Sequence, residues 1–308
     1  MLLILAFLVV TIVILLIGLV VIPTTEKMVA STVVDPVSLP SIREALAAVF
    51  SPLSCLQGKS YDTNFGKIPC RMPSGDYNQA TAKYLFRIIM NIAAGNCSYL
   101  GPVPFPDGFN AHRLKAVTPI TLQFHRKRIF GFVLTSGDPC DVAIVAYSGT
   151  LYWDEWLADA MFPQVAPEAL NNYREGMRVH NGFYGIYMAV RAQLQRWIPT
   201  NAKRLIICGH SMGAALATLT AFDFAAYGPE VYAFAPPRVG NNAFANKSAQ
   251  LLPKAFKIIN TADLIPTLPP PVFPNTTYTH TGTVIPFIRN LGSIGGNHVE
   301  AYKQFLGL

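Results

Sequence analysis

Charged side chains are scarce in this sequence. Only 13% of its 308 residues are Asp, Glu, Lys or Arg, whereas 51% are hydrophobic. The mean hydropathy of +0.33 indicates that part of the chain is built for a membrane. Acidic residues are fewer than basic ones, 17 against 24, but the resulting net charge of +7 forms no long basic block. No aromatic residues are interleaved with base-reading side chains, so nucleic-acid binding has little support.

Cysteine pairs with the spacing of a zinc site are also lacking. The five cysteines lie at positions 55, 70, 97, 140 and 208, and no two of them are spaced C-x-x-C. Cys208 lies in an apolar run and is expected to be a buried free thiol, whereas the other four could form two disulfides. Sequons at Asn96, Asn246 and Asn275 fit the same oxidising compartment. We therefore expect a glycoprotein whose folded part is lumenal or extracellular.

The long apolar run at the N-terminus lacks the basic residues that usually precede a secretory signal. Leu2 to Ile22 comprises 21 residues interrupted only by Thr11 and Gly18. As a helix it would measure about 32 Å, which is enough to cross a hydrocarbon core about 30 Å thick. A cleaved signal usually has a shorter apolar region after a basic start. We expect a single-pass membrane protein with its anchor at residues 1–25, and secretion after signal cleavage is the alternative.

The remainder of the chain separates into a linker with an N-terminal extension, 26–78, and one α/β domain, 79–308. Apolar runs in the second part predict strands at Val142–Tyr147, Arg204–Cys208, Glu230–Phe234 and Ala255–Asn260. Helical spacing predicts helices at 79–94, Phe183–Trp197, Met212–Tyr227 and His298–Phe305. Residues 129–150 read as a hairpin of core strands. This alternation predicts a mostly parallel sheet covered by helices on both faces, with ligands bound beyond the carboxyl ends of the strands.

A Gly-x-Ser-x-Gly motif at 209–213 joins one predicted strand to the next predicted helix. A sharp strand-to-helix turn of this kind presents its serine, here Ser211, as a nucleophile. The simpler interpretation is a serine that caps the N-terminus of the helix. Gly209 and Gly213 favour the nucleophile, because a side chain at either position would collide across so tight a turn.

A serine nucleophile needs a base and a carboxylate that orients the base. In the expected chain order, three carboxylates lie between Ser211 and the last histidine. Asp223 lies deep in the predicted helix, and Glu230 begins a strand at the wrong end of the sheet. Asp263 follows a strand at its carboxyl end, so we predict that Asp263 is the orienting carboxylate.

Two histidines follow Asp263. His280 lies in "YTHTGTV", whose alternation predicts a strand, whereas His298 follows the glycine-rich segment "GSIGGN" and begins a helix. A base is usefully placed on such a loop, so we predict His298. His210 precedes the nucleophile, and its side chain is expected to turn away from the pocket.

The oxyanion that forms during acyl transfer needs backbone N–H donors. One is expected from Met212, directly after the nucleophile. The other is expected from the loop that ends "VAIVAYSGT", at Gly149 and Thr150.

Several short stretches occur in the order typical of one family: "YSGT", "WDEWLAD", "VHNGF", "GHSMGAALA", "PPRVGN", "NTADLIPTLPP" and "NHVEAY". In them the chain resembles the class 3, or fungal-type, lipases of the α/β-hydrolase superfamily, from about residue 79 to 302. The resemblance implies an α/β-hydrolase fold, to which the apolar run at the N-terminus would add a transmembrane helix. It also implies Ser211 as nucleophile, Asp263 as orienting group, His298 as base, and Thr150 with Met212 as the oxyanion hole.

At two positions this sequence differs from the usual pattern of the family. The Arg-Gly that usually precedes the oxyanion residue is Ser148-Gly149 here, and the position of a second glycine common in the serine turn of the family is occupied by Ala214.

Residues 151–162, "LYWDEWLADAMF", correspond in the family to a lid over the active site. They are amphipathic, with Trp153 and Trp156 among acidic residues. A helix packed permanently on the core is the alternative.

Together these features predict a serine hydrolase that cleaves acyl esters of glycerolipids, a triacylglycerol or diacylglycerol lipase acting at a membrane surface. Such chemistry needs no metal and no organic cofactor. Phospholipase A1 or a feruloyl-type esterase is the enzymatic alternative. A catalytically idle membrane protein that binds lipid in its pocket is the alternative from another class.

Overall fold

The computed structural model describes residues 60–65, 75–95, 102–121, 124–137, 141–149, 163–273 and 275–308, with the backbone alone for 116–128. The predicted anchor, most of the linker and extension, and the predicted lid lie outside these ranges, so their assignments and the domain bounds stay predictions. Within these ranges no helix is long and apolar enough to cross a membrane. All of the described residues belong to one compact unit.

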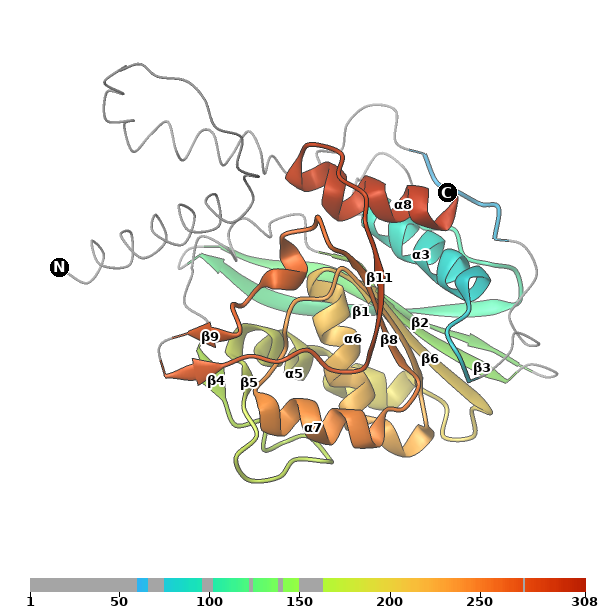
Figure 1. Ribbon diagram of the computed structural model, residues 1–308. Coiled ribbons are helices and arrows are strands. Elements are labelled where there is room, and N and C mark those ends of the chain that lie inside the picture. The colour runs from blue at the N-terminus through green and yellow to red at the C-terminus, as the bar shows by residue number, and fades with distance from the viewer. Residues whose placement is uncertain are drawn as a thin grey trace, which may run out of the picture. The chain divides into compact units, whose positions relative to one another are not determined.

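A seven-stranded sheet is the central layer (Figure 1), with strand order β1-β2-β3-β6-β7-β8-β11. Its strands are β1 Phe109–Thr121, β2 Phe124–Ser136, β3 Val142–Tyr147, β6 Arg204–His210, β7 Glu230–Phe234, β8 Ala255–Asn260 and β11 Thr283–Phe287. The five strands from β3 to β11 in this order are parallel, and β2 pairs antiparallel with both β1 and β3. The prediction of a mostly parallel sheet is confirmed.

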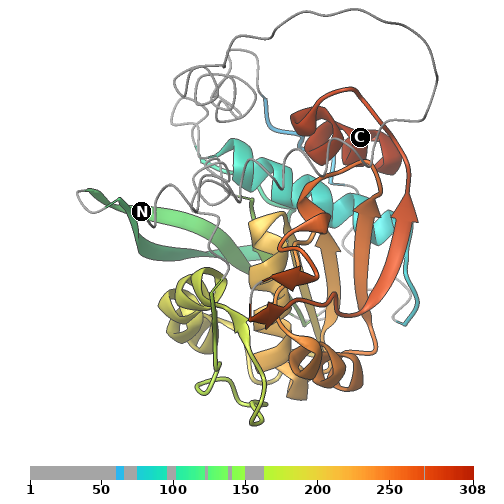
Figure 2. The same ribbon diagram turned by 60° about the vertical axis from the view of Figure 1, so that its left-hand side comes forward.

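Helices cover both faces of the sheet (Figures 1 and 2). Helices α3 (Gln79–Ala94) and α8 (Ala301–Leu306) lie on one face, and α5 (Asn181–Trp197), α6 (Met212–Asp223) and α7 (Asn242–Leu251) lie on the other. Every residue of β3 is buried, because alternate side chains of a strand point to opposite, covered faces. Ile144 joins the core cluster that contains α3, whereas the hydroxyl of Tyr147 bonds that of Thr220 in α6 at 2.7 Å.

Short elements complete the fold around the sheet. They are the strand pairs β4 (Gln164–Val165) with β5 (Val179–His180) and β9 (Val272–Phe273) with β10 (Thr276–Thr277), and the helical turns η3 (Ala225–Tyr227), η4 (Ile265–Thr267) and η5 (Gly296–Glu300).

The strand predicted around His280 is wrong. This residue lies between β10 and β11 and belongs to neither. Gly282 has φ +75°, which interrupts extended backbone, and Thr279 makes only an isolated bridge to Gly240. The alternation of the sequence here reflects a half-buried connection between two short strands.

Candidate active site

Ser211 forms a sharp turn between β6 and α6. Its backbone has φ 59° and ψ −127°, a conformation that is strained for a residue with a Cβ atom. The Ser211 N–H donates to the carbonyl of Phe234 at 2.9 Å, and its carbonyl accepts from the N–H of Ala214 at 2.9 Å. The side chain makes no capping hydrogen bond to α6. The interpretation of Ser211 as a helix cap is therefore wrong.

Neither elbow glycine can be replaced by a residue with a side chain, because the added Cβ atom would lie too close to the backbone. A Cβ atom at Gly209 would lie 2.1 Å from the carbonyl oxygen of Gly213, and one at Gly213 would lie 2.5 Å from that of Ser148. Both distances are far below van der Waals contact, so the predicted collision across the turn is confirmed. A Cβ atom at Gly149 would lie 3.3 Å from the Cβ of Ser211. The loop after β3 therefore lies directly beside the serine.

Asp263 and His298 meet at the carboxyl edge of the sheet. Asp263 follows β8, His298 lies in η5, and the His298 Nδ1 is 2.8 Å from the Asp263 Oδ2. Both residues are buried, and the other carboxylate oxygen accepts from the N–H of Ile265 at 3.0 Å. A carboxylate only accepts hydrogen bonds, so the neutral form of the imidazole carries its proton on Nδ1 and has its lone pair on Nε2, as the predicted base requires.

Two asparagines hold the loops of this pair together. The Asn260 side chain, at the end of β8, donates to the carbonyls of Arg289 and Asn297 at 2.8 and 2.9 Å. Asn297, which directly precedes His298, donates from its side chain to the carbonyl of Ala262 at 3.0 Å. The residues next to Asp263 and His298 are therefore bonded across the gap between β8 and η5.

Two further side chains contact the pair, and neither contact was predicted from the sequence. Tyr302 donates its hydroxyl to the Asp263 Oδ2 at 3.1 Å and accepts from the N–H of Asn260 at 2.9 Å. Burial, together with the Asp263 charge, raises the pKa of Tyr302 well above its usual value, so its hydroxyl keeps its proton. Tyr302 lies four residues after His298, a helical spacing that could have indicated a shared face.

His210 is the second such side chain. Its Nε2 is 2.8 Å from the carbonyl oxygen of His298, and the two imidazole rings lie 4.5 Å apart. The prediction that its side chain turns away from the pocket did not include this contact with the predicted base. Burial lowers the pKa of His210 well below its usual value, so the ring is neutral and donates from Nε2 to the carbonyl.

The alternative partners are occupied elsewhere. Asp223 accepts from the Tyr187 hydroxyl at 2.5 Å and the Arg191 Nε at 2.7 Å. Glu230 pairs with Arg204 at 2.7 Å.

His280 also has a partner of its own. Its Nε2 is 2.8 Å from the carbonyl oxygen of Pro266. Burial, with the nearby Lys257, lowers the pKa of His280 to about 4. His280 is therefore neutral at physiological pH, and it does not share the Asp263 carboxylate.

The remaining predicted site residues divide into two groups. Met212 is the first residue of α6, so its N–H lies at a helix N-terminus, where anions are stabilised. Thr150 and the lid tryptophans Trp153 and Trp156 lie outside the described residues.

Cys208 is a buried free thiol, as predicted, and burial raises its pKa. Among the residues that the structure describes, no cluster of three or more His, Cys, Asp or Glu side chains could hold a metal ion.

Comparison with known proteins shows which family part of the chain resembles. Residues 144–273, which include most of β3, the turn at Ser211 and Asp263, match the family described as "Lipase (class 3)". This match with the class 3 lipases covers 130 of the 308 residues. The chain is 34% identical over 134 residues to the secreted mono- and diacylglycerol lipase A of Penicillium cyclopium, covering 41% of this chain and 42% of the relative.

A plant relative matches a longer stretch. The galactolipase DONGLE of Arabidopsis thaliana is 28% identical over 208 residues, covering 53% of this chain and 44% of the relative. The chain therefore spans less than half the length of these curated relatives. Among solved structures, the Rhizomucor miehei lipase propeptide complex superposes with a TM-score of 0.54 at 19% identity, covering 76% of this chain and 81% of that one. This likeness shows the α/β-hydrolase fold.

Proposed function

We propose that this chain is a class 3 lipase, a serine hydrolase that cleaves acyl esters of glycerolipids. The observation that carries the proposal is the strained turn at Ser211, whose side chain does not cap the helix that it precedes. The hydrogen-bonded pair of His298 and Asp263 lies at the same edge of the sheet. A serine, a base and an orienting carboxylate at one edge are the groups that acyl transfer needs.

In the proposed reaction, Ser211 attacks the ester carbonyl while the His298 Nε2 takes the hydroxyl proton. Asp263 stabilises the imidazolium, and the backbone N–H groups of Met212 and Thr150 bind the oxyanion. The intermediate collapses to an acyl-enzyme, and His298 returns the proton to the departing glycerolipid alcohol. Water then attacks the acyl-enzyme by the same route and releases the fatty acid and free Ser211.

The relatives support a lipid ester as substrate but differ in the class of lipid. One is named a mono- and diacylglycerol lipase, one a galactolipase and one a phospholipase A1. We propose an acylglycerol as the main substrate, with phospholipase A1 activity as the second candidate. We also propose that residues 151–162, with Trp153 and Trp156, act as a lid that opens at a lipid surface.

A fluorophosphonate probe tests the chemistry before any substrate is known. The full chain is expected to be labelled on Ser211, as located by peptide mass spectrometry. His298→Ala should label far more slowly, because the serine then has no base. A chain that stays unlabelled while binding lipid would be the idle binding protein instead.

A lipid panel then separates the candidate substrates. Triacylglycerol, diacylglycerol, phosphatidylcholine and galactolipid are offered side by side, and the fatty acid released from each is measured. Faster release from diacylglycerol than from phosphatidylcholine supports the acylglycerol proposal, whereas the reverse order supports phospholipase A1.

A further inference from the structure

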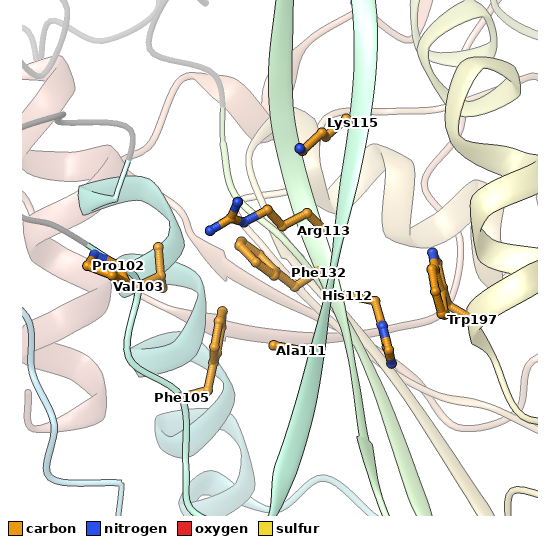
Figure 3. A pocket seen from close by; sticks show the side chains of 9 residues that line it. All are labelled: Pro102, Val103, Phe105, Ala111, His112, Arg113, Lys115, Phe132 and Trp197. Atoms are coloured by element: carbon orange, nitrogen blue, oxygen red, sulfur yellow. The ribbon is translucent and has the colours of Figure 1, made fainter.

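A cavity of about 520 Å³ lies at the base of the β1–β2 hairpin, which comprises residues 109–136. Its walls are Pro102, Val103, Phe105, Ala111, His112, Arg113, Lys115, Phe132 and Trp197 (Figure 3). Phe105 and Phe132 pack with their ring centroids 4.7 Å apart, and His112 stacks on Trp197 at 4.0 Å. The cavity therefore combines an aromatic lining with cationic side chains.

The cations at this cavity have no acidic partner in the part of the chain that the structure describes. No ion pair or side-chain hydrogen bond links the head group of Arg113 or Lys115 to a described residue. Figure 3 shows both side chains leaving the same side of β1. The backbone of Lys115 is held in place, because Gln193 of α5 donates to its carbonyl at 2.6 Å and accepts from its N–H at 2.9 Å.

The charged residues of the β1–β2 hairpin are all basic. Residues 109–136 contain five Lys and Arg residues and no Asp or Glu. Arg126, Lys127 and Arg128 belong to β2 and pair in register with residues 118, 117 and 116 of β1. The register sets none of these five basic residues opposite another, and no acidic residue of the hairpin offsets their charge, so the hairpin attracts an anionic partner.

The strand register places this charge at the edge of the sheet that holds the candidate active site. The last residue of β3, Tyr147, pairs with Gly131 of β2, and Gly131 pairs with Leu114 of β1. The hairpin therefore continues past the carboxyl end of β3 for about 20 Å at about 3.3 Å per residue, and Figure 2 shows it projecting from the sheet. It leaves the sheet where the Ser148 N–H donates to the carbonyl of Phe130 at 3.0 Å, in the loop that lies beside Ser211.

A large apolar side chain is exposed at the same edge. Ile288, directly after the carboxyl end of β11, is 79% exposed. A soluble anion would need only the cations, whereas a lipid surface offers phosphate groups and an apolar interior together.

We propose that the β1–β2 hairpin binds the surface of an anionic lipid bilayer, with lipid phosphates at Arg113 and Lys115. The bound hairpin turns the carboxyl edge of the sheet toward the lipid. This inference concerns where the folded chain sits, so it holds or fails separately from the proposed hydrolysis.

Energy transfer from Trp197 to a dansyl-labelled lipid tests this contact. Trp197 lies at the cavity, and Trp153→Phe with Trp156→Phe leaves it as the last of the three tryptophans. The full chain with these two changes is mixed with vesicles of phosphatidylcholine, with or without phosphatidylglycerol. The predicted anchor is common to both samples, so it contributes equally to each. We expect more transfer with phosphatidylglycerol, and we expect added NaCl to remove the difference.

A matched pair of variants assigns the effect to the hairpin. Arg113→Gln with Lys115→Gln should lower transfer to the phosphatidylcholine value. Lys247→Gln with Lys254→Gln removes the same charge from partly exposed sites in and after α7, and it should leave transfer unchanged. Circular dichroism melting of each variant shows that the fold is kept. Equal transfer from both vesicle types, or an equal loss in both variant pairs, would overturn the proposal.

Discussion

The carboxylate of Asp263 accepts hydrogen bonds from two side chains on one oxygen. His298 donates to the Oδ2 at 2.8 Å and Tyr302 donates at 3.1 Å. The second donor holds the carboxylate in the orientation that the imidazole needs, so Tyr302 acts on the proposed reaction through Asp263.

Tyr302→Phe removes this donor and keeps the ring in the core. A hydrogen bond to a charged group is worth about 1.5–3 kcal/mol, so we expect kcat to fall roughly tenfold or more while KM stays close to that of the wild type. Steady-state hydrolysis of a soluble short-chain ester measures both constants. The control is Tyr84→Phe, because the Tyr84 hydroxyl is buried and bonds no described residue. A similar fall in kcat in both variants would show that Tyr302 has no specific role.

Lys257 is a second residue with an unusual environment. Its side chain is buried on β8 and donates to the hydroxyl of Thr218 at 2.9 Å. Burial lowers the pKa of Lys257 to about 7. Between about pH 7 and the unfolded value near 10.5, the unfolded chain binds a proton that the folded chain lacks. The free energy of unfolding should therefore rise with pH across this window. Below pH 7 the folded chain bears the full cost of keeping a charged lysine buried.

Lys257→Met should raise the free energy of unfolding by a few kcal/mol at pH 6 and change it little above about pH 10. Urea unfolding followed by circular dichroism at several pH values measures the difference. Thr218 keeps a partner, because its hydroxyl also donates to the carbonyl of Ala214. Lys247→Met, at a partly exposed site, should show no such pH dependence. Parallel pH profiles for the wild type and Lys257→Met would contradict this account.

At the scale of elements, the turn between β6 and α6 has no room for a side chain at Gly213. Gly213→Ala would place a Cβ atom 2.5 Å from the Ser148 carbonyl oxygen and 2.8 Å from that of Tyr147. Both neighbours are backbone, so the turn must move. We expect a loss of about 1–3 kcal/mol in stability and a strong loss of ester hydrolysis, measured by thermal unfolding and by initial rates.

Gly185→Ala is the matched control within helix α5. Nothing lies within 4 Å of a Cβ atom at this exposed position, and alanine favours the helix by about 0.5–1 kcal/mol. This variant should melt at the same temperature as the wild type or higher, with full activity. Equal effects of the two changes would mean that the turn is not sterically closed.

The elements that could be predicted are those buried on both sides. β3, β7 and β8 have the expected bounds because each consists mostly of apolar residues that are buried in the sheet. β1 was not predicted, since it is an edge strand whose residues include His112, Arg113 and Lys115. The predicted helix Met212–Tyr227 ends at Asp223, where the chain tightens into η3.

The candidate site was predictable where sequence order limits the choice. Asp263 and His298 were selected by their positions after β8 and after the glycine-rich segment, and the structure brings their side chains together. The contacts of Tyr302 and His210 could not be predicted, because they depend on how η5 and α8 pack against β6 and β8.

At the scale of the whole molecule, the side of the membrane on which the chain folds is still a prediction. The sequons at Asn246 and Asn275 lie at exposed positions, where a glycan meets no packed core. Expression in a secretory host should give a product whose mass falls after enzymatic deglycosylation, and Asn275→Gln should remove one glycan. A chain without glycan and with all five cysteines as free thiols, counted after unfolding, would place the folded part on the cytosolic side.

The central claim is that Ser211 is the nucleophile of a lipid esterase. The most direct measurement is the rate of fatty acid release from diacylglycerol in mixed micelles by the full chain and by Ser211→Ala, with circular dichroism to show that both are folded. We predict a fall of about a thousandfold or more, with little further loss when Asp263→Ala and His298→Ala are added, because the three groups act as one unit. A folded Ser211→Ala chain that hydrolyses diacylglycerol at a rate near that of the wild type would contradict the account.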